Sequence, residues 1–524
     1  MDYHEYAIIG TGPSGISAAL QLEKLDACII DVAQSSKSQF PYPSLSTALD
    51  DKNSQGLLGQ NWDFLDNIQY PNNIHPKLRS EHVRHVMQGE KFAVFEEKNR
   101  LVVKGQGSYA AGGMANIWGG QLLRYFQDDF VDLASWPIDI NELNPFYTDL
   151  EEHIGLSGEN DAMAHYLGEN KNLLPPVPIG PAASYLLKKY QTHKSRKSLK
   201  GLSLGHPRLA VLTQAYKNRT AYNFGETEFF KIGEDGIYNP KQSLSDIIER
   251  GQSKYYAGYK LTQYQEYDDY VDLYLEEVST KRTRQIRVKH LLLGCGTIQT
   301  SKLILQQYAE KGIRLPFLDH PPHLLPVFFP KVFGTSITSK TYPIQLVATQ
   351  AHDGIRDMIS FYYPGGMLWS DIVSDIPLPL KKAFQILPVL INSMLVAQIW
   401  EPTSSHQSNY LSLSPDQDIK IQYNYREKSK SIPPLISKLR HLGGISLSRL
   451  ASSSLPSWGF HHAGTLPMKS SPQKYETHTD GRLWDSQRVR IIDASVLPSL
   501  PAKNSSFTMM ANAARIAQEA TRLK

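Results

Sequence analysis

The chain has 524 residues, which is enough for two or three domain-sized cores, and its 41% hydrophobic and 20% charged residues are ordinary for a globular protein. Its formal net charge of +4 is small for this length, so the composition gives no reason to expect a nucleic acid or a strongly acidic partner. The two cysteines, Cys28 and Cys295, lie far apart in apolar runs, which argues against a disulfide framework or a metal site.

A glycine-rich turn near the N-terminus carries the strongest signal. The apolar run at residues 7–9 stops at Gly10, and a helical pattern follows directly. Gly10 permits a tight turn, Gly12 lets a pyrophosphate approach bare backbone, and Gly15 lets the helix pack closely on its strand. A second apolar run ends in Asp31, whose carboxylate suits the ribose hydroxyls. The sequence therefore predicts a dinucleotide site, against an accidental glycine turn, at Gly10, Gly12, Pro13, Ser14, Gly15 and Asp31.

The first strand begins a few residues after Met1, which leaves no room for a signal peptide, and we expect a cytoplasmic protein. Residues 34–99 are polar with few clean periods, and we interpret them as loops and short helices. Residues 112–121 then place four glycines and a tryptophan in ten positions, a density that indicates backbone lying against something flat or bulky rather than a plain surface loop. The cofactor contacts expected here are Gly112, Gly113, Met114, Asn116, Ile117 and Trp118.

The middle of the chain offers weaker signals. A basic cluster at residues 188–200 suits either an anionic substrate or a solvated face. Strand patterns at 271–275 and 286–294 lead into a second glycine turn and helix, which lacks the third glycine and is expected to return to the first sheet. Without a separate nicotinamide fold, the electrons are expected to come from an organic substrate.

The segment from 321 to 460 alternates strand-like stretches, including 325–329 and 419–423, and predicts an antiparallel sheet that roofs the cofactor. The aromatic patch at 361–369 suits core packing or stacking on a sugar ring. The longest apolar stretch, residues 383–400, is interrupted by polar residues and is too polar to span a bilayer. We expect a core helix there, with an apolar rim that meets lipid as the alternative.

The C-terminal region carries groups suited to an alcohol. His461 and His462 precede a glycine turn, and Asn504 lies just before a helix expected at 507–520. A neutral imidazole accepts a hydroxyl proton near pH 7, and an amide orients the same hydroxyl without competing for its proton.

Taken together, these motifs resemble the glucose-methanol-choline (GMC) family of FAD-dependent oxidoreductases. Gly10–Gly15 with Asp31 is similar to the family's flavin fingerprint, and Asp319-His-Pro321 to its mid-chain motif. The family's C-terminal signature resembles His461-His-Ala-Gly-Thr465, Asp493-Ala-Ser495 and Asn504. The resemblance implies that His461 is the catalytic base with Asn504 as its partner, and His462 is the second choice. It adds cofactor contacts at Asp493, Ala494, Asn504, Ser505 and Thr508.

The motif at 112–118 is most similar to the sugar-oxidising, pyranose-oxidase-like branch of that family. In that branch the motif carries a histidine that bonds covalently to flavin, and this chain has Ile117 instead. We therefore expect non-covalent FAD.

The resemblance implies an α/β fold, with a Rossmann-like FAD-binding domain and an α+β substrate domain built on an antiparallel sheet. The FAD-binding domain is expected at 1–145, 238–322 and 462–524, and the substrate-binding domain at 146–237 and 323–461. No metal site and no transmembrane segment are expected.

The expected function is oxidation of a sugar, polyol or glycoside hydroxyl to a carbonyl, by hydride transfer to flavin with His461 as base. Oxygen, a quinone or an electron-transfer protein would then accept the electrons. A non-redox lyase or isomerase of the same fold, and a non-catalytic flavin-binding protein, are the alternatives.

Overall fold

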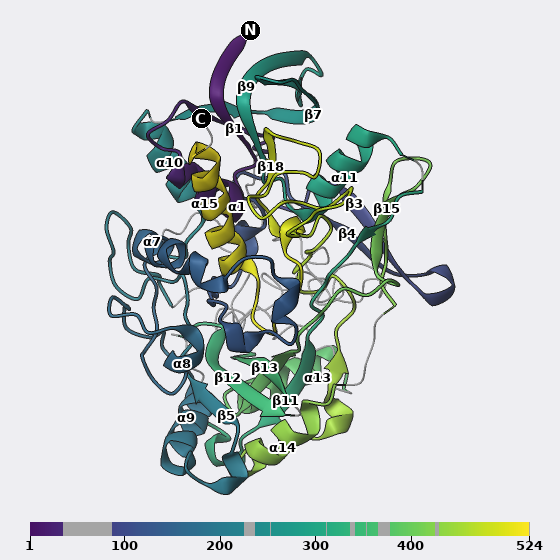
Figure 1. The fold of residues 1–524 in the computed structure, drawn as a ribbon. Helices are drawn as coiled ribbons and strands as arrows, with labels where there is room; N and C mark the ends of the chain where they lie inside the picture. The colour runs from purple at the N-terminus through teal and green to yellow at the C-terminus, as the bar shows by residue number, and fades with distance from the viewer. Residues whose placement is uncertain are drawn as a thin grey trace.

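The computed structural model describes residues 1–34, 86–224, 236–251, 253–310, 312–335, 341–352, 354–364, 378–424 and 429–522. Three sheets and the helices packed on them make up this part of the chain (Figure 1). The first sheet lies at the end that holds the chain termini, and the third at the opposite end.

The first sheet contains the strand that leads into the glycine turn. Its order is β6-β2-β1-β9-β8-β7, and β18 pairs with β9 beyond that path. The pairs β1–β2, β1–β9, β2–β6 and β9–β18 are parallel, and the β7–β8–β9 edge is antiparallel. The last residues of β1 (7–9) and most of β2 are continuous apolar runs, which are buried within the sheet. The strands are β1 (Asp2–Ile9), β2 (Ala27–Asp31), β6 (Ser253–Ala257), β7 (Tyr259–Glu266), β8 (Val271–Glu277), β9 (Thr283–Leu293) and β18 (Val489–Ile491).

Helix α1 (Pro13–Gln21) follows β1 directly, with proline at its first position, where the missing N–H costs nothing. It packs against the C-terminal helix α15 (Ser506–Arg522), and a hydrophobic cluster joins both helices to one face of the sheet. The other helices are α7 (Asn144–Ile154), α8 (Ala164–Leu167), α9 (Pro181–His193), α10 (Pro240–Glu249), α11 (Thr297–Tyr308), α13 (Leu380–Ile391) and α14 (Ile432–His441).

The second sheet joins distant parts of the chain in the order β10-β15-β16-β3-β4. Its strands are β10 (Leu315–Pro316), β15 (Tyr410–Leu413), β16 (Ile419–Gln422), β3 (Lys91–Glu96) and β4 (Arg100–Gln106). β16 pairs with β3 in parallel, and the other pairs are antiparallel. The short η turns are η3 (Glu97–Asn99), η4 (Gly113–Ile117), η5 (Gln127–Asp129), η6 (Leu133–Ser135), η7 (Ile140–Leu143), η8 (Lys197–Leu199), η10 (Pro330–Val332), η11 (Ser448–Leu450) and η12 (Ala494–Val496).

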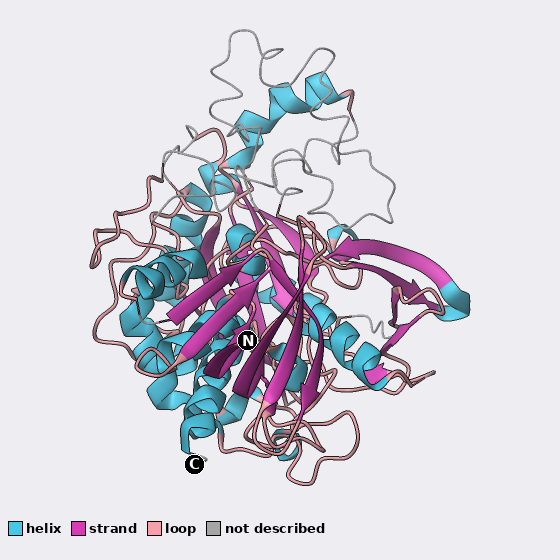
Figure 2. Ribbon diagram, turned by 90° about the horizontal axis from the view of Figure 1, so that it is seen from above, coloured by secondary structure: helices cyan, strands magenta, loops and turns pink. Residues whose placement is uncertain are grey.

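The third sheet is antiparallel in every pairing and runs in the order β17-β11-β14-β13-β12-β5. Figure 2 views the molecule from the end that holds the N-terminus, where strands fill the middle and helices lie beside them. One of its faces forms a hydrophobic cluster with α9 and α14. The opposite face points toward the rest of the molecule. The strands are β17 (Ser452–Ser453), β11 (His323–Phe328), β14 (Met394–Trp400), β13 (Ile355–Tyr362), β12 (Ile344–His352) and β5 (Leu202–Gly205).

The expected α/β fold class, with an added antiparallel sheet, is confirmed. The strands expected at 271–275 and 286–294 are present as β8 and β9, and β9 returns to the first sheet beside β1. The expected C-terminal helix is α15. All strands of the first sheet lie in the ranges expected for the FAD-binding domain, and all strands of the third sheet lie in those expected for the substrate-binding domain. The second sheet contains strands from both sets of ranges. The domain boundaries therefore stay a prediction.

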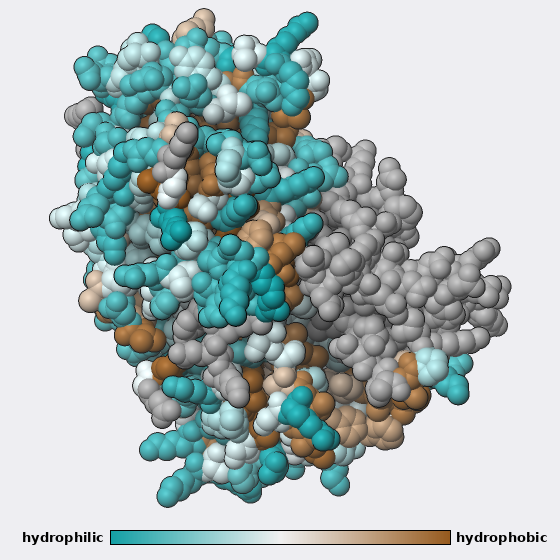
Figure 3. Space-filling model, turned by 90° about the vertical axis from the view of Figure 1, so that its right-hand side faces the viewer, coloured by the Kyte–Doolittle hydropathy of each residue, from teal (hydrophilic) through white to brown (hydrophobic). Residues whose placement is uncertain are grey.

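The prediction of a single core helix at 383–400 is wrong. Helix α13 ends at Ile391, and after Asn392 and Ser393 the chain enters β14, an interior strand of the third sheet. The Asn392 amide donates to the carbonyl of Thr335 at 3.0 Å, and the Ser393 hydroxyl donates to Leu390 at 2.6 Å, so polar side chains end the helix. Ile386 and Val389 of α13 are 41% and 45% exposed. Hydrophobic side chains appear on the surface toward the end of the molecule that holds the third sheet (Figure 3).

Two further expectations need correction. Loops and short helices were expected over 34–99, but β3 lies within that range, and its buried Phe92 and Val94 alternate with less buried residues in the period of a strand. Residues 35–85 lie outside the described part. The stretch at 419–423 is a strand, but β16 belongs to the second sheet rather than the roof. In the patch at 361–369, Phe361 is buried in β13, and residues 365–369 are not described.

None of the helices that the structure describes has the length and apolar character needed to span a bilayer.

Candidate active site

The glycine turn after β1 has the geometry that the sequence predicts. Gly10 has φ +99°, and a Cβ there would come 2.6 Å from the carbonyl oxygen of Gly294. A Cβ on Gly15 would collide with the carbonyl oxygen of Gly10, so the first turn of α1 lies against the loop. By contrast, a Cβ on Gly12 would meet nothing within 4 Å. The backbone at Gly12 therefore borders open space at the N-terminus of α1, where a phosphate fits.

Asp31 ends β2 beside this turn. Its carboxylate accepts a hydrogen bond from the hydroxyl of Thr11. Burial raises the pKa of Asp31 to about 6, although hydrogen bonds from Thr11 and from the backbone oppose the rise. We call the turn at Gly10–Gly15 the glycine cradle. The Asp31 carboxylate is thus held at the edge of this cradle, in the position expected for a ribose partner.

The second glycine-rich segment closes on the first. The N–H of Gly112 donates to Oγ1 of Thr11 at 3.0 Å, and the atom nearest to a Cβ on Gly113 would be Cα of Gly12. Both Gly112 and Gly113 have positive φ, +84° and +58°. The Asn116 amide donates to the carbonyl oxygens of Ala111 and Gly113 at 2.8 Å each. This loop is therefore held rigidly over the turn at Gly10–Gly15.

The side chains of the second loop divide into two groups. Met114 and Trp118 are partly buried, and the indole N–H of Trp118 donates to the carbonyl of Tyr238 at 2.9 Å. Ile117 is 0% exposed and packs inside a hydrophobic cluster.

The carboxyl ends of β1, β9 and β18 converge at the same edge of the first sheet. The Asp493 carboxylate, just after β18, accepts hydrogen bonds from the Gly296 N–H at 3.0 Å and from the hydroxyl of Thr300. The Asp493 carboxylate also accepts from the N–H and the hydroxyl of Ser495. Asp493 therefore ties the loop after β9 to the C-terminal segment, and its side chain is buried.

His461 and His462 have opposite surroundings. His461 is half-buried, and its ring stacks on Trp400 with centroids 4.7 Å apart. His462 is buried against the rings of Phe92 and Phe317, and burial lowers its pKa to about 3. Its Nε2 has no hydrogen-bond partner, and its carbonyl accepts from Thr297 at 2.7 Å. His462 therefore stays neutral within the core, and His461 is the imidazole that solvent or a substrate reaches.

Asn504 lies at the entrance to α15 and faces a second amide. Its Nδ2 donates to the carbonyl oxygen of Gln121 at 3.0 Å, and its buried Oδ1 has no hydrogen-bond partner within the part of the chain that the structure describes. Ala502 packs in one hydrophobic cluster with Trp400, the residue on which His461 stacks. The segment that carries Asn504 and the residue on which His461 stacks thus belong to one hydrophobic cluster.

A line of polar side chains continues from Gln121 onto the third sheet. The side chains of Gln121 and Ser360 are 3.3 Å apart, and Ser360 lies opposite Gln398 in the register of β13 and β14. Among the described residues, none makes a hydrogen bond to the buried Oε1 of Gln398. This face therefore offers two unpaired acceptors, on Asn504 and Gln398, which a ligand with several hydroxyl groups would satisfy.

The remaining predicted contacts lie inside the protein. Ser14, Ala494, Ser505 and Thr508 are all buried. Thr508 Oγ1 lies 2.6 Å from the hydroxyl of Tyr147, so its hydrogen bond is made within the fold. Pro13 begins α1.

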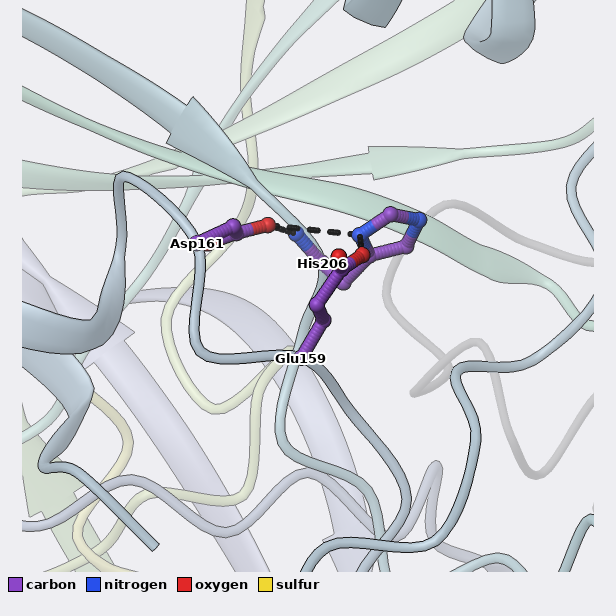
Figure 4. A group of neighbouring side chains, drawn as sticks. All are labelled: Glu159, Asp161 and His206. Atoms are coloured by element: carbon purple, nitrogen blue, oxygen red, sulfur yellow. Dashed lines mark hydrogen bonds and ion pairs between the residues drawn. The ribbon is translucent and has the colours of Figure 1, made fainter. Parts of the chain in front are cut away.

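Among the described residues, one group has the chemistry of a metal site: Glu159, Asp161 and His206 (Figure 4). Nδ1 of His206 lies 3.1 Å from Glu159 and 3.2 Å from Asp161, and its other ring nitrogen points away from both acids. The Asp161 carboxylate also accepts from the backbone N–H groups of Met163 and His206. We interpret these contacts as structural, since they join the loop that carries Glu159 and Asp161 to the segment that carries His206.

Sequence reasoning missed Thr11, Gln121, Gln398 and Trp400. A hydroxyl beside a glycine or an amide within a strand has no spacing signature, because the fold alone brings these side chains together. His320 stood within the motif at 319–321, but the motif assigned it no role.

Residues 446–513 match the C-terminal domain of the family described as GMC oxidoreductase. No curated protein matches the sequence. The fold is similar to that of pyridoxine 4-oxidase from Mesorbium loti, with a TM-score of 0.63 and 11% identity over 99% of this chain and 100% of that one. It is also similar to a formate oxidase from Aspergillus oryzae RIB40, studied for the effect of an R554K mutation on FAD modification. The TM-score is 0.63 and the identity 13%, over 99% of this chain and 98% of that one.

Proposed function

We propose that this chain, an oxidoreductase with a GMC C-terminal domain and the GMC fold, oxidises a hydroxyl group of a sugar or related polyol to a carbonyl, with His461 as the base. The single observation that carries the proposal is that an accessible imidazole stacks on Trp400, whose hydrophobic cluster includes Ala502 of the segment that carries Asn504.

The cradle fits the FAD that the family uses. Open space over Gly12, the loop at Gly112 and the carboxylate of Asp31 provide a pyrophosphate site and a ribose partner in one place. Bound there, FAD supplies the acceptor for a hydride. We propose that it is held without a covalent bond, since Ile117 is apolar and fully buried. The chromophore should then leave the polypeptide after acid precipitation, and a yellow pellet would contradict this.

The chain's own residues divide the remaining work. His461 accepts the proton of the substrate hydroxyl, a step that contributes roughly a hundred- to ten-thousand-fold in other enzymes. Asn504 orients that hydroxyl through an amide that Gln121 holds in place. The burial of His462 among aromatic rings supports the choice of His461 over His462 as the base.

The polyol part of the proposal rests on the unpaired acceptors. Oδ1 of Asn504 and Oε1 of Gln398 are buried without a donor. A buried acceptor without a partner costs about 1–3 kcal/mol, and a substrate with several hydroxyl groups removes that cost. A simple aliphatic alcohol has one O–H donor, which is directed at His461, and it leaves both acceptors unpaired.

The test is anaerobic reduction of the FAD-loaded protein by sugars, glycosides, polyols and aliphatic alcohols, followed at the flavin absorbance. We expect bleaching by polyhydroxylated compounds and slow or no bleaching by aliphatic alcohols. Faster bleaching by aliphatic alcohols would overturn the substrate class, and no bleaching by any alcohol would favour the lyase or the non-catalytic alternative.

A further inference from the structure

His320 lies in the structure between a backbone carbonyl and the proposed base. It is buried, and its Nε2 is 2.7 Å from the carbonyl oxygen of Glu401. A carbonyl oxygen only accepts hydrogen bonds, so Nε2 of His320 carries a hydrogen.

The other ring nitrogen of His320 faces His461. The two Nδ1 atoms lie 3.4 Å apart. Burial lowers the pKa of His320 to about 4, so its ring is neutral near pH 7 and has a single N–H. Because that N–H is at Nε2, Nδ1 of His320 is an acceptor, and the hydrogen between the two rings belongs to His461.

The rings are fixed against rotation. Trp400 packs on both imidazoles, with centroids 4.9 Å from His320 and 4.7 Å from His461. The side chain of Glu401 accepts hydrogen bonds from the hydroxyls of Ser429 and Ser431 at 2.6 and 2.5 Å, which anchors the residue whose carbonyl holds His320.

Burial outweighs the charge of Glu401, which raises the pKa of His320, and the pKa stays at about 4. Burial raises the pKa of Glu401, but hydrogen bonds from His323, Ser429 and Ser431 outweigh it and bring the value to about 2, so this acid is already paired. Burial raises the pKa of the neighbouring Asp319 to about 6, and its carboxylate accepts from the N–H of Ser457.

We propose that His320 is a positioning residue that holds His461 in the tautomer with its proton on Nδ1, so that Nε2 is the nitrogen that accepts the substrate proton. The functional half of this inference rests on the proposed role of His461. The tautomer itself follows from the donors and acceptors of the two rings.

A direct test is the two-bond ¹H–¹⁵N correlation spectrum of protein labelled with ¹⁵N-histidine, with the His461 signal identified by its loss in His461→Asn. We expect an Nδ1–H tautomer of His461 near pH 7, with and without FAD. An Nε2–H tautomer in the unaltered protein would overturn the proposal, whatever the fate of the variants.

Two substitutions form a matched pair. His320→Gln can keep the donor to Glu401 but loses the acceptor toward His461, whereas His320→Asn can keep an oxygen near the position of Nδ1. We expect His461 to lose its Nδ1–H tautomer in His320→Gln, with a fall in kcat/KM of about 10- to 100-fold. In His320→Asn we expect the Nδ1–H tautomer to be kept and kcat/KM to stay within a few-fold of the unaltered protein. Equal losses in the two variants, with an unchanged tautomer, would show a merely structural role.

The two readouts separate this inference from the proposed function. If His461→Asn retains full activity while the tautomer shifts in His320→Gln, the assignment of the base is wrong and the tautomer assignment stands. If His461→Asn is inactive while the tautomer is unchanged in His320→Gln, the base stands and the positioning role is wrong.

Discussion

The imidazole of His461 stacks on the indole of Trp400, with ring centroids 4.7 Å apart and planes 28° from parallel. Trp400 ends β14 of the third sheet, whereas His461 follows that sheet in the C-terminal segment. The proposed base is therefore supported by the antiparallel sheet, and the glycine cradle is built separately on the first sheet. This division lets the cofactor site and the base be tested independently.

The cradle gives the first prediction. Gly12→Ala adds a methyl group where the protein itself has open space. The free energy of unfolding of the apoprotein should therefore stay within about 0.5 kcal/mol of the unaltered value. The same methyl group occupies the place of the pyrophosphate, so FAD binding should be lost. Thermal unfolding and FAD titration measure the two effects. Gly15→Ala is the contrasting variant, because its Cβ collides with Gly10, and it should fail to fold. Full FAD affinity in Gly12→Ala would contradict the assignment.

The carboxylate of Asp31 predicts a pH dependence of FAD affinity. Burial raises its pKa to about 6, and only the ionised form is a full acceptor for two ribose hydroxyls. Affinity should be constant above this pKa and should fall about tenfold for each pH unit below it. Asp31→Asn should bind FAD more weakly, without this dependence. Quenching of flavin fluorescence on binding measures both proteins, and identical pH profiles would refute the role of Asp31.

Gln398 provides a test of specificity. Gln398→Leu removes the unpaired acceptor, so a polyol should lose about 10- to 100-fold in kcat/KM, and an aliphatic alcohol should lose little. Steady-state kinetics with both substrates checks the ratio. Gln422→Leu, on the second sheet, is the control, and it should leave the ratio unchanged. An equal loss for both substrates would indicate damage to packing instead.

Arg490 predicts an effect on stability alone. This guanidinium is fully buried in β18, its three nitrogens have no hydrogen-bond partner, and Asp480 lies 3.9 Å away. Arg490→Met should leave the free energy of unfolding unchanged or raise it by up to about 4 kcal/mol, because the cost of burying the charge disappears. Arg482→Met, which breaks a 2.6 Å ion pair with the same Asp480, should instead lower it slightly. Denaturant unfolding of the apoproteins measures both free energies of unfolding. A clearly lower free energy of unfolding in Arg490→Met would refute this explanation.

The parts of the fold that the sequence predicts are those with local signatures. Gly10, Gly12 and Gly15 have distinct steric roles that recur wherever this turn is used, and β9 follows from alternating apolar residues that run into three leucines. The stretch at 383–400 was misread because apolar content alone does not distinguish a helix from a strand, and the break at Asn392 depends on a contact with Thr335.

The candidate site was only partly accessible from sequence. His461 and Asn504 were named through motifs, and burial then distinguishes His461 from His462. Gln121 lies hundreds of residues before Gln398 and Trp400, which share β14. Their common location depends on the register of β13 with β14 and on the packing of the C-terminal segment. No local pattern encodes such a juxtaposition.

The most direct measurement of the central claim is the rate of anaerobic flavin reduction by a polyol substrate in His461→Asn, compared with His462→Phe at matched FAD loading. The account predicts a loss of about a hundred- to ten-thousand-fold for His461→Asn and a small change for His462→Phe. A rate in His461→Asn within a few-fold of the unaltered protein would contradict it.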